Sequence, residues 1–145
     1  MEKKMKLLEL LEKDCMLPLE KLAVMCDMTY DEAAAIDYLK ENKILLCNKS
    51  VINWERTDKE FVTSMIELKV TPQRGEGFDK IAERIYKYPE VKSVYLMAGA
   101  YDLFVTIEGR TMKEVALFVA NRLAPMECVV STGTHFVLKK YKEEG

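Results

Sequence analysis

The sequence is poor in the residues that build metal centres and catalytic sites. It contains one histidine, His135, and four cysteines, none of which forms a Cys-x-x-Cys pair. Because a zinc site needs closely spaced thiolates or imidazoles, we expect no metal and no cofactor, and we interpret the cysteines as reduced core residues. The sequence also has no nucleophile–base pair and no phosphate-binding loop, so we do not expect an enzyme.

Long apolar runs are absent as well. No stretch approaches the roughly 20 apolar residues that a membrane helix needs. Charged residues interrupt the apolar residues among the first nine positions, whereas a signal peptide has an uninterrupted apolar segment. We therefore expect a cytoplasmic protein with no membrane contact, and reduced cysteines agree with that compartment.

The chain also lacks an excess of positive charge. It has 22 Lys and Arg residues against 24 Asp and Glu residues, a net charge of −2. Nucleic-acid-binding proteins usually carry a basic excess, so this balance argues against DNA binding, although charge can be local. The length of 145 residues, 49% of them hydrophobic, is sufficient for one ordinary domain or two very small ones.

The first third of the chain has a helical pattern. Leucine spacing predicts a helix over residues 2–13. Proline suits the first turn of a helix, so Pro18 favours the start of a second helix. Thr29 and Glu32 form a capping-box pattern, which predicts a third helix from there to Asn42.

Two short β-prone runs follow these helices, at residues 44–46 and 51–54. They flank the turn-forming stretch 48–50, so we expect a hairpin. Three helices and a hairpin make a winged helix-turn-helix, and we assign this domain to residues 1–55. Residues 56–60 are interpreted as a connecting segment.

The remaining residues, 61–145, alternate between strand and helix patterns. The expected strands are 61–70, 91–98, 101–108 and 128–141, and the expected helices lie before Pro89 and before Pro125. Thr111 and Glu114 form a second capping-box pattern, which predicts the start of the latter helix. This βαββαβ order is that of a ferredoxin-like sandwich, so the whole chain is expected to be α+β. Such a domain leaves one sheet face bare, and a second subunit usually covers it.

Several motifs resemble the Lrp/AsnC family of prokaryotic transcriptional regulators. Val91-x-x-Val94-Tyr95-x-Met97-Ala98-Gly99-Ala100-Tyr101-Asp102 resembles the family's strand–glycine–x–x–aspartate–strand element, and Val129 to Thr134 followed by Val137-Leu138-Lys139 resembles its closing strand. Leu22-Ala23 resembles the family's second-helix signature, and Ile36-x-x-Leu39-x-x-x-x-Ile44 resembles the end of its DNA-reading helix and the start of the wing. The resemblance implies an ACT/RAM-type second domain and a homodimer or larger homo-oligomer. It also implies that a small effector, commonly an amino acid, binds between neighbouring domains.

The candidate effector residues follow from this resemblance. Glycine at Gly99 would let a ligand approach the main chain, and the Asp102 carboxylate could accept hydrogen bonds from an ammonium group. An alternative is that the two residues only form and cap a hairpin turn. The full candidate set is Gly99, Ala100, Tyr101, Asp102, Thr132 and Thr134.

The predicted DNA-reading helix is acidic. Asp31, Glu32 and Asp37 would repel phosphate, and residues 1–54 contain eight lysines against ten Asp and Glu residues. Lys43 stands where the family usually has glycine, so we expect Asn42 to provide the left-handed helix stop. The candidate contacts to double-stranded DNA are Thr29, Tyr30, Lys40, Lys43, Asn48 and Lys49.

Three functions are compatible with parts of this pattern. The first is a DNA-binding transcriptional regulator that senses a small effector, expected to be an amino acid. The second is an oligomeric sensor or adaptor that has lost DNA binding, which the acidic helix favours. The third is an enzyme like the sirohaem decarboxylases that share this architecture; they need histidines and arginines around a tetrapyrrole, and the single His135 argues against that activity.

Overall fold

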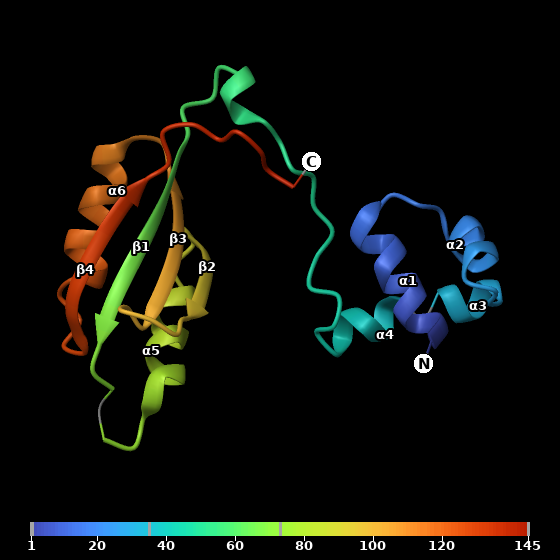
Figure 1. Cartoon of the computed structure of the whole chain (residues 1–145), viewed down its shortest axis with the longest axis horizontal. Helices are drawn as coiled ribbons and strands as arrows, with labels where there is room; N and C mark the ends of the chain where they lie inside the picture. Colours follow the sequence, from blue (N-terminus) through green and yellow to red (C-terminus); the bar gives the residue numbers. More distant parts are fainter. Residues whose placement is uncertain (1, 35, 73, 145) are drawn as a thin grey trace. The chain divides into compact units, whose positions relative to one another are not determined.

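The computed structural model describes residues 2–34, 36–72 and 74–144, and the chain forms two compact units (Figure 1). The first unit ends at Val51 and the second begins at Ile52, ahead of the expected domain end at residue 55. Trp54 belongs to the second unit because its ring packs on Phe61, with ring centroids 6.2 Å apart.

The first unit is a bundle of short helices. They are α1 (Glu2–Lys13), α2 (Leu19–Met25), α3 (Tyr30–Ala33) and α4 (Ile36–Glu41). The region expected to be one third helix is thus described as α3 and α4. Apolar residues at helical spacing meet in one core cluster, Leu7, Leu11, Leu22, Cys26 and Leu39. The expected capping box is confirmed: Glu32 N–H donates to Thr29 Oγ1 at 3.1 Å, and Thr29 N–H donates to Glu32 Oε2 at 3.2 Å.

The end of α4 departs from the expectation about Asn42. The left-handed residue is Lys43, with φ +57°. Lys43 N–H donates to Lys40 O at 3.1 Å and Ile44 N–H donates to Leu39 O at 2.9 Å, the hydrogen-bond pattern of a Schellman helix end. Asn42 instead donates from its side chain to the Tyr38 carbonyl at 2.8 Å. A lysine therefore adopts the left-handed backbone conformation that glycine adopts most readily.

The expected wing hairpin is wrong. Within the described residues, 44–53 contain no strand, and their apolar side chains Ile44, Leu46, Val51 and Ile52 are exposed. An isolated two-stranded hairpin is only marginally stable unless a third strand or a helix packs against it. Local β-propensity cannot provide such a packing partner. Asn48 and Lys49 therefore lie in an extended segment and not at the tip of a wing.

The second unit confirms the expected βαββαβ order and the α+β class. A short 3₁₀ helix, Trp54–Arg56, precedes it. Its elements are β1 (Val62–Val70), α5 (Gly77–Tyr86), β2 (Val91–Leu96), β3 (Leu103–Gly109), α6 (Met112–Phe118) continued by the π-helical turn η2 (Val119–Leu123), and β4 (Val129–Phe136). The strands form one antiparallel sheet in the order β2-β3-β1-β4 (Figure 1).

Alternation along the strands separates the two faces of this sheet. Ile66 and Leu68 of β1 are fully buried in a core with Val105 of β3 and with Ile81 and Val115 of the helices. Burial of such side chains stabilises the fold by about 1.5–3 kcal/mol each. The opposite face, called the open face below, carries Met65, Glu67, Tyr95, Phe104 and His135 by strand register.

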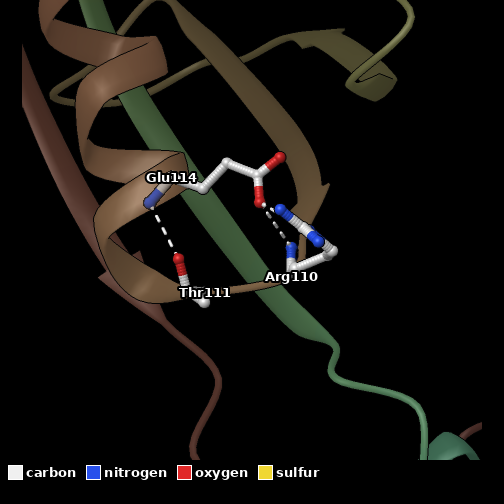
Figure 2. Close-up of polar contacts among 3 residues, drawn as sticks. All are labelled: Arg110, Thr111 and Glu114. Atoms are coloured by element: carbon white, nitrogen blue, oxygen red, sulfur yellow. Dashed lines mark hydrogen bonds and ion pairs between the residues drawn. The ribbon is translucent and has the colours of Figure 1, made fainter.

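The start of α6 is fixed by three neighbouring residues (Figure 2). Glu114 N–H donates to Thr111 Oγ1 at 3.1 Å, as the capping-box pattern predicts. The reciprocal bond is displaced by one residue, because Glu114 Oε2 accepts from Arg110 N–H at 3.2 Å. The Arg110 Nε lies 3.5 Å from the same oxygen, so one carboxylate holds both the main chain and the side chain of Arg110.

The last strand is shorter than expected. β4 ends at Phe136, whereas the sequence pattern continued to Tyr141. Beyond it, Val137 N–H donates to Thr63 O at 2.9 Å, and Lys140 N–H donates to the Glu55 carboxylate at 3.1 Å. The tail therefore leaves the sheet edge and is tied to the segment that precedes β1.

Candidate effector site and DNA-binding surface

The turn between β2 and β3 is joined to the end of β1. Asp102 Oδ2 accepts from Val70 N–H at 2.9 Å, and Asp102 N–H donates to Leu68 O at 3.0 Å. Gly99 has φ +152°, a conformation that L side chains rarely adopt, and a Cβ there would meet no atom within 4 Å. The turn thus presents an open main chain beside a carboxylate whose Oδ1 makes no hydrogen bond to any described residue.

The two threonines of β4 share one face, as predicted. The register pairs Thr132 with Leu68 and Thr134 with Ile66, so both side chains lie on the helix-covered side of the sheet. Thr132 is half-buried and Thr134 is exposed. Leu68 pairs with Thr132 on one side and accepts the Asp102 N–H bond on the other. Thr132 therefore lies nearer than Thr134 to the predicted effector turn.

A polar group on the open face was missed by the sequence analysis. Glu67 Oε2 lies 3.2 Å from His135 Nε2. A Cβ built on Gly133 would lie 3.7 Å from Glu67 Oε2, from His135 Nε2 and from Tyr101 Oη. Tyr101 therefore faces away from Thr132 and Thr134, and the six predicted effector residues do not converge on one face. Only strand register reveals this group, because Glu67 and His135 are 68 residues apart in sequence.

The predicted DNA contacts all lie on the surface of the first unit. Tyr30 is 52% exposed, and Lys40, Lys43, Asn48 and Lys49 are exposed. The Thr29 hydroxyl already accepts the Glu32 N–H bond of the capping box. The acidic residues Asp31 and Asp37 are exposed on the same two short helices, so their charge is not masked by burial.

The first turn of α1 lies beside these helices and was not singled out from the sequence. Lys4 Nζ lies 5.2 Å from the centroid of the Tyr38 ring, a cation–π contact with α4. A cleft of about 570 Å³ is lined by Glu2, Lys3, Lys4, Met28 and Glu32. Two lysines from the start of the chain thus stand next to the predicted DNA-reading helix.

Groups of metal-ligating side chains and helices suited to span a membrane are both absent from the described part of the chain. No three His, Cys, Asp or Glu side chains gather there in a way that could hold a metal ion. None of its helices combines the length and the apolar character needed to cross a membrane.

Comparisons with known proteins agree on one family. Residues 63–145 match the family model described as the Lrp/AsnC ligand binding domain. The HTH-type transcriptional regulator YugG of Bacillus subtilis is 47% identical over 99% of this chain and 88% of its own length. The HTH-type transcriptional regulator FL11 of Pyrococcus furiosus is 30% identical over 95% of this chain and 89% of its own length.

Solved structures share the fold across both units. Leucine response regulatory protein LrpA of Mycobacterium tuberculosis matches with a TM-score of 0.82 and 15% identity, covering 100% of this chain and 97% of that chain. The regulator NMB0573 of Neisseria meningitidis, solved with L-Met, matches with a TM-score of 0.73 and 19% identity, covering 99% and 92%. Escherichia coli AsnC matches with a TM-score of 0.67 and 15% identity, covering 95% and 91%.

Proposed function

Because this chain belongs to the Lrp/AsnC family of transcriptional regulators, we propose that it binds duplex DNA through α2 to α4 and adjusts that binding when an amino acid occupies its second unit. It acts in the cytoplasm, where prokaryotic DNA lies. The observation that carries the proposal is the order of the two units: a helix-turn-helix unit is followed by the family's ligand-binding domain. Its relatives are regulators and not enzymes, so the decarboxylase alternative is set aside.

The effector site of this proposal centres on the turn that contains Gly99. The free Oδ1 of Asp102 would accept a hydrogen bond from the ammonium group of the effector, and the open main chain at Gly99 and Ala100 would receive its carboxylate. The Thr132 hydroxyl is available beside the same strand end. The solved complex of NMB0573 with L-Met supports an amino acid as the ligand class.

The proposed oligomer forms through the open face. Tyr95 is 55% exposed and Met65 is 36% exposed there, and Phe104 lies between them in the register. Apolar and aromatic side chains on an uncovered sheet face are stabilised when a second subunit buries them. We assign the occupant of this face to a second copy of the chain, and the proposal extends to assemblies larger than the dimer.

The test is fluorescence anisotropy with DNA from the region upstream of the gene that encodes this chain, at near-physiological salt, with and without a panel of amino acids. Specific binding that changes with one amino acid would support the proposal. Ala100→Arg should abolish the amino-acid response and leave DNA binding unchanged, because a long side chain beside Gly99 would obstruct the open main chain proposed to receive the effector carboxylate. Ala116→Arg on the exposed side of α6 is the matched control and should keep the response.

A second function, a sensor or adaptor that no longer binds DNA, is favoured by one observation. The exposed Asp31 and Asp37 sit on the helices that should face phosphate. This function predicts amino-acid binding, seen as a rise in thermal stability, with no DNA binding even at low salt. Salt-sensitive DNA binding by the purified chain would exclude it.

A further inference from the structure

The first turn of α1 breaks a local stability rule. The positive end of the helix dipole favours acidic side chains and disfavours cations. α1 has only Glu2 as an acid there, together with Lys3 and Lys4, and Lys6 follows directly after that turn. The start of α3, in contrast, follows the rule with Asp31 and Glu32. Departures from local rules are expected where function requires them, so the lysines need a reason other than helix stability.

The positions of Lys3 and Lys4 suggest that reason. They precede the buried Leu7 by four and three residues, so they lie on the side of α1 that packs against the core. Both side chains are exposed. Figure 1 shows the start of α1 near α3 and α4, and the cleft lined by the two lysines includes Glu32 of α3. The Tyr38 ring of α4 holds the Lys4 ammonium at 5.2 Å.

Neither lysine is neutralised by its neighbours. Lys3 and Lys4 form no ion pair with any described residue. Glu2 and Glu32 line the same cleft, but among the described residues neither carboxylate forms an ion pair with Lys3 or Lys4. Two ammonium groups therefore remain available beside the acidic helices that the proposed function directs toward DNA.

We propose that Lys3 and Lys4 contact the phosphate backbone of duplex DNA beside α4 and supply the positive charge that α3 and α4 lack. This inference rests on the proposed DNA binding. Lys3 and Lys4 would supply the electrostatic attraction between the protein and the DNA. Lysine suits this role because its ammonium group is a compact point charge on a flexible stem. Contacts of this kind are independent of base sequence, so they make binding depend on salt.

The experiment is a salt titration of the full-length chain with a mixed-sequence DNA duplex, followed by fluorescence anisotropy. Each phosphate contact contributes about 0.9 to the slope of log K against log salt. The double variant Lys3→Gln/Lys4→Gln should therefore lower the slope by about 1.8 for each bound subunit. Lys6→Gln is the matched control. Lys6 lies within one helical turn of both lysines, but its side chain points about 100° away from that of Leu7. The slope should therefore not change.

A second variant separates DNA contact from a structural role. Lys3→Glu places an acid at the positive end of the helix dipole, so it should raise the thermal midpoint of the helical unit while it weakens DNA binding. An unchanged slope for Lys3→Gln/Lys4→Gln, or an equal loss for Lys6→Gln, would overturn the inference and leave the proposed function intact. A wild-type chain that does not bind the duplex at low salt would overturn both.

Discussion

The main-chain N–H of Val70 donates a 2.9 Å hydrogen bond to the Oδ2 atom of Asp102, 32 residues away in the sequence. Val70 ends β1, and Asp102 ends the turn that leads into β3. The same aspartate donates its N–H to Leu68 O at 3.0 Å. The proposed effector turn is thus bonded to the central part of the sheet, so a ligand that alters the turn also acts on the end of β1.

Replacing Asp102 by alanine should destabilise the second unit by about 1–3 kcal/mol, because the partly buried Val70 N–H loses its acceptor. Asp102→Asn keeps an acceptor oxygen and should cost less. Urea unfolding followed by Trp54 fluorescence measures this, since the only tryptophan packs on Phe61 within that unit. Equal stability of Asp102→Ala and the wild type would show that the hydrogen bond is not stabilising.

Lys43→Gly should stabilise the first unit by about 1 kcal/mol, because glycine adopts the left-handed conformation at the end of α4 without the Cβ penalty. Lys43→Ala removes the same charge but keeps a Cβ, so it should bring little gain. Thermal unfolding followed by helical circular dichroism compares the two variants. The same proteins test Lys43 as a phosphate contact, because charge loss weakens DNA binding in both. A DNA affinity equal to that of the wild type in both variants would argue against that role.

Thr111→Ala should cost about 1 kcal/mol, because the Glu114 N–H at the start of α6 loses its cap. Thr111→Ser keeps the hydroxyl and should remain close to the wild type (Figure 2). Urea unfolding with Trp54 fluorescence gives the difference. A loss as large for serine as for alanine would point to the threonine methyl group and not to the hydrogen bond.

Met65→Lys should weaken self-association by about tenfold or more, equivalent to about 1.4 kcal/mol, because the charge would lie at the proposed subunit interface on the open face. Met112→Lys, at the exposed start of α6, is the control and should leave assembly unchanged. Sedimentation velocity over a range of concentrations measures both. A monomeric wild-type chain, or equal effects of the two substitutions, would contradict the open face as the interface.

Much of the fold could be predicted because its signals are local. The capping pairs Thr29–Glu32 and Thr111–Glu114 start helices where the pattern placed them. Strand and helix periodicities predicted the βαββαβ order of the second unit. The exception is residues 44–53, whose β-prone runs form no strand, since a strand needs a pairing partner that local propensity does not provide.

The candidate sites were predictable only in part. The resemblance led to Gly99 and Asp102, and their assignment to an effector remains a prediction, as do the DNA contacts. That Tyr101 joins Glu67 and His135 around Gly133, away from Thr132, could not be read from spacing along the chain. A shift of one residue in strand register would move every one of these side chains to the other face.

The sequence by itself determined most of the helices and strands, how two of the helices begin, and which family the motifs resemble, because those properties depend on residues a few positions apart. Only the tertiary structure decided that the Asp102 carboxylate is bonded to Val70, that Lys43 takes the left-handed helix end, and that Lys4 stands over the Tyr38 ring. Those outcomes depend on strand register and helix packing, which are set by the free energy of the whole core and not by any one segment.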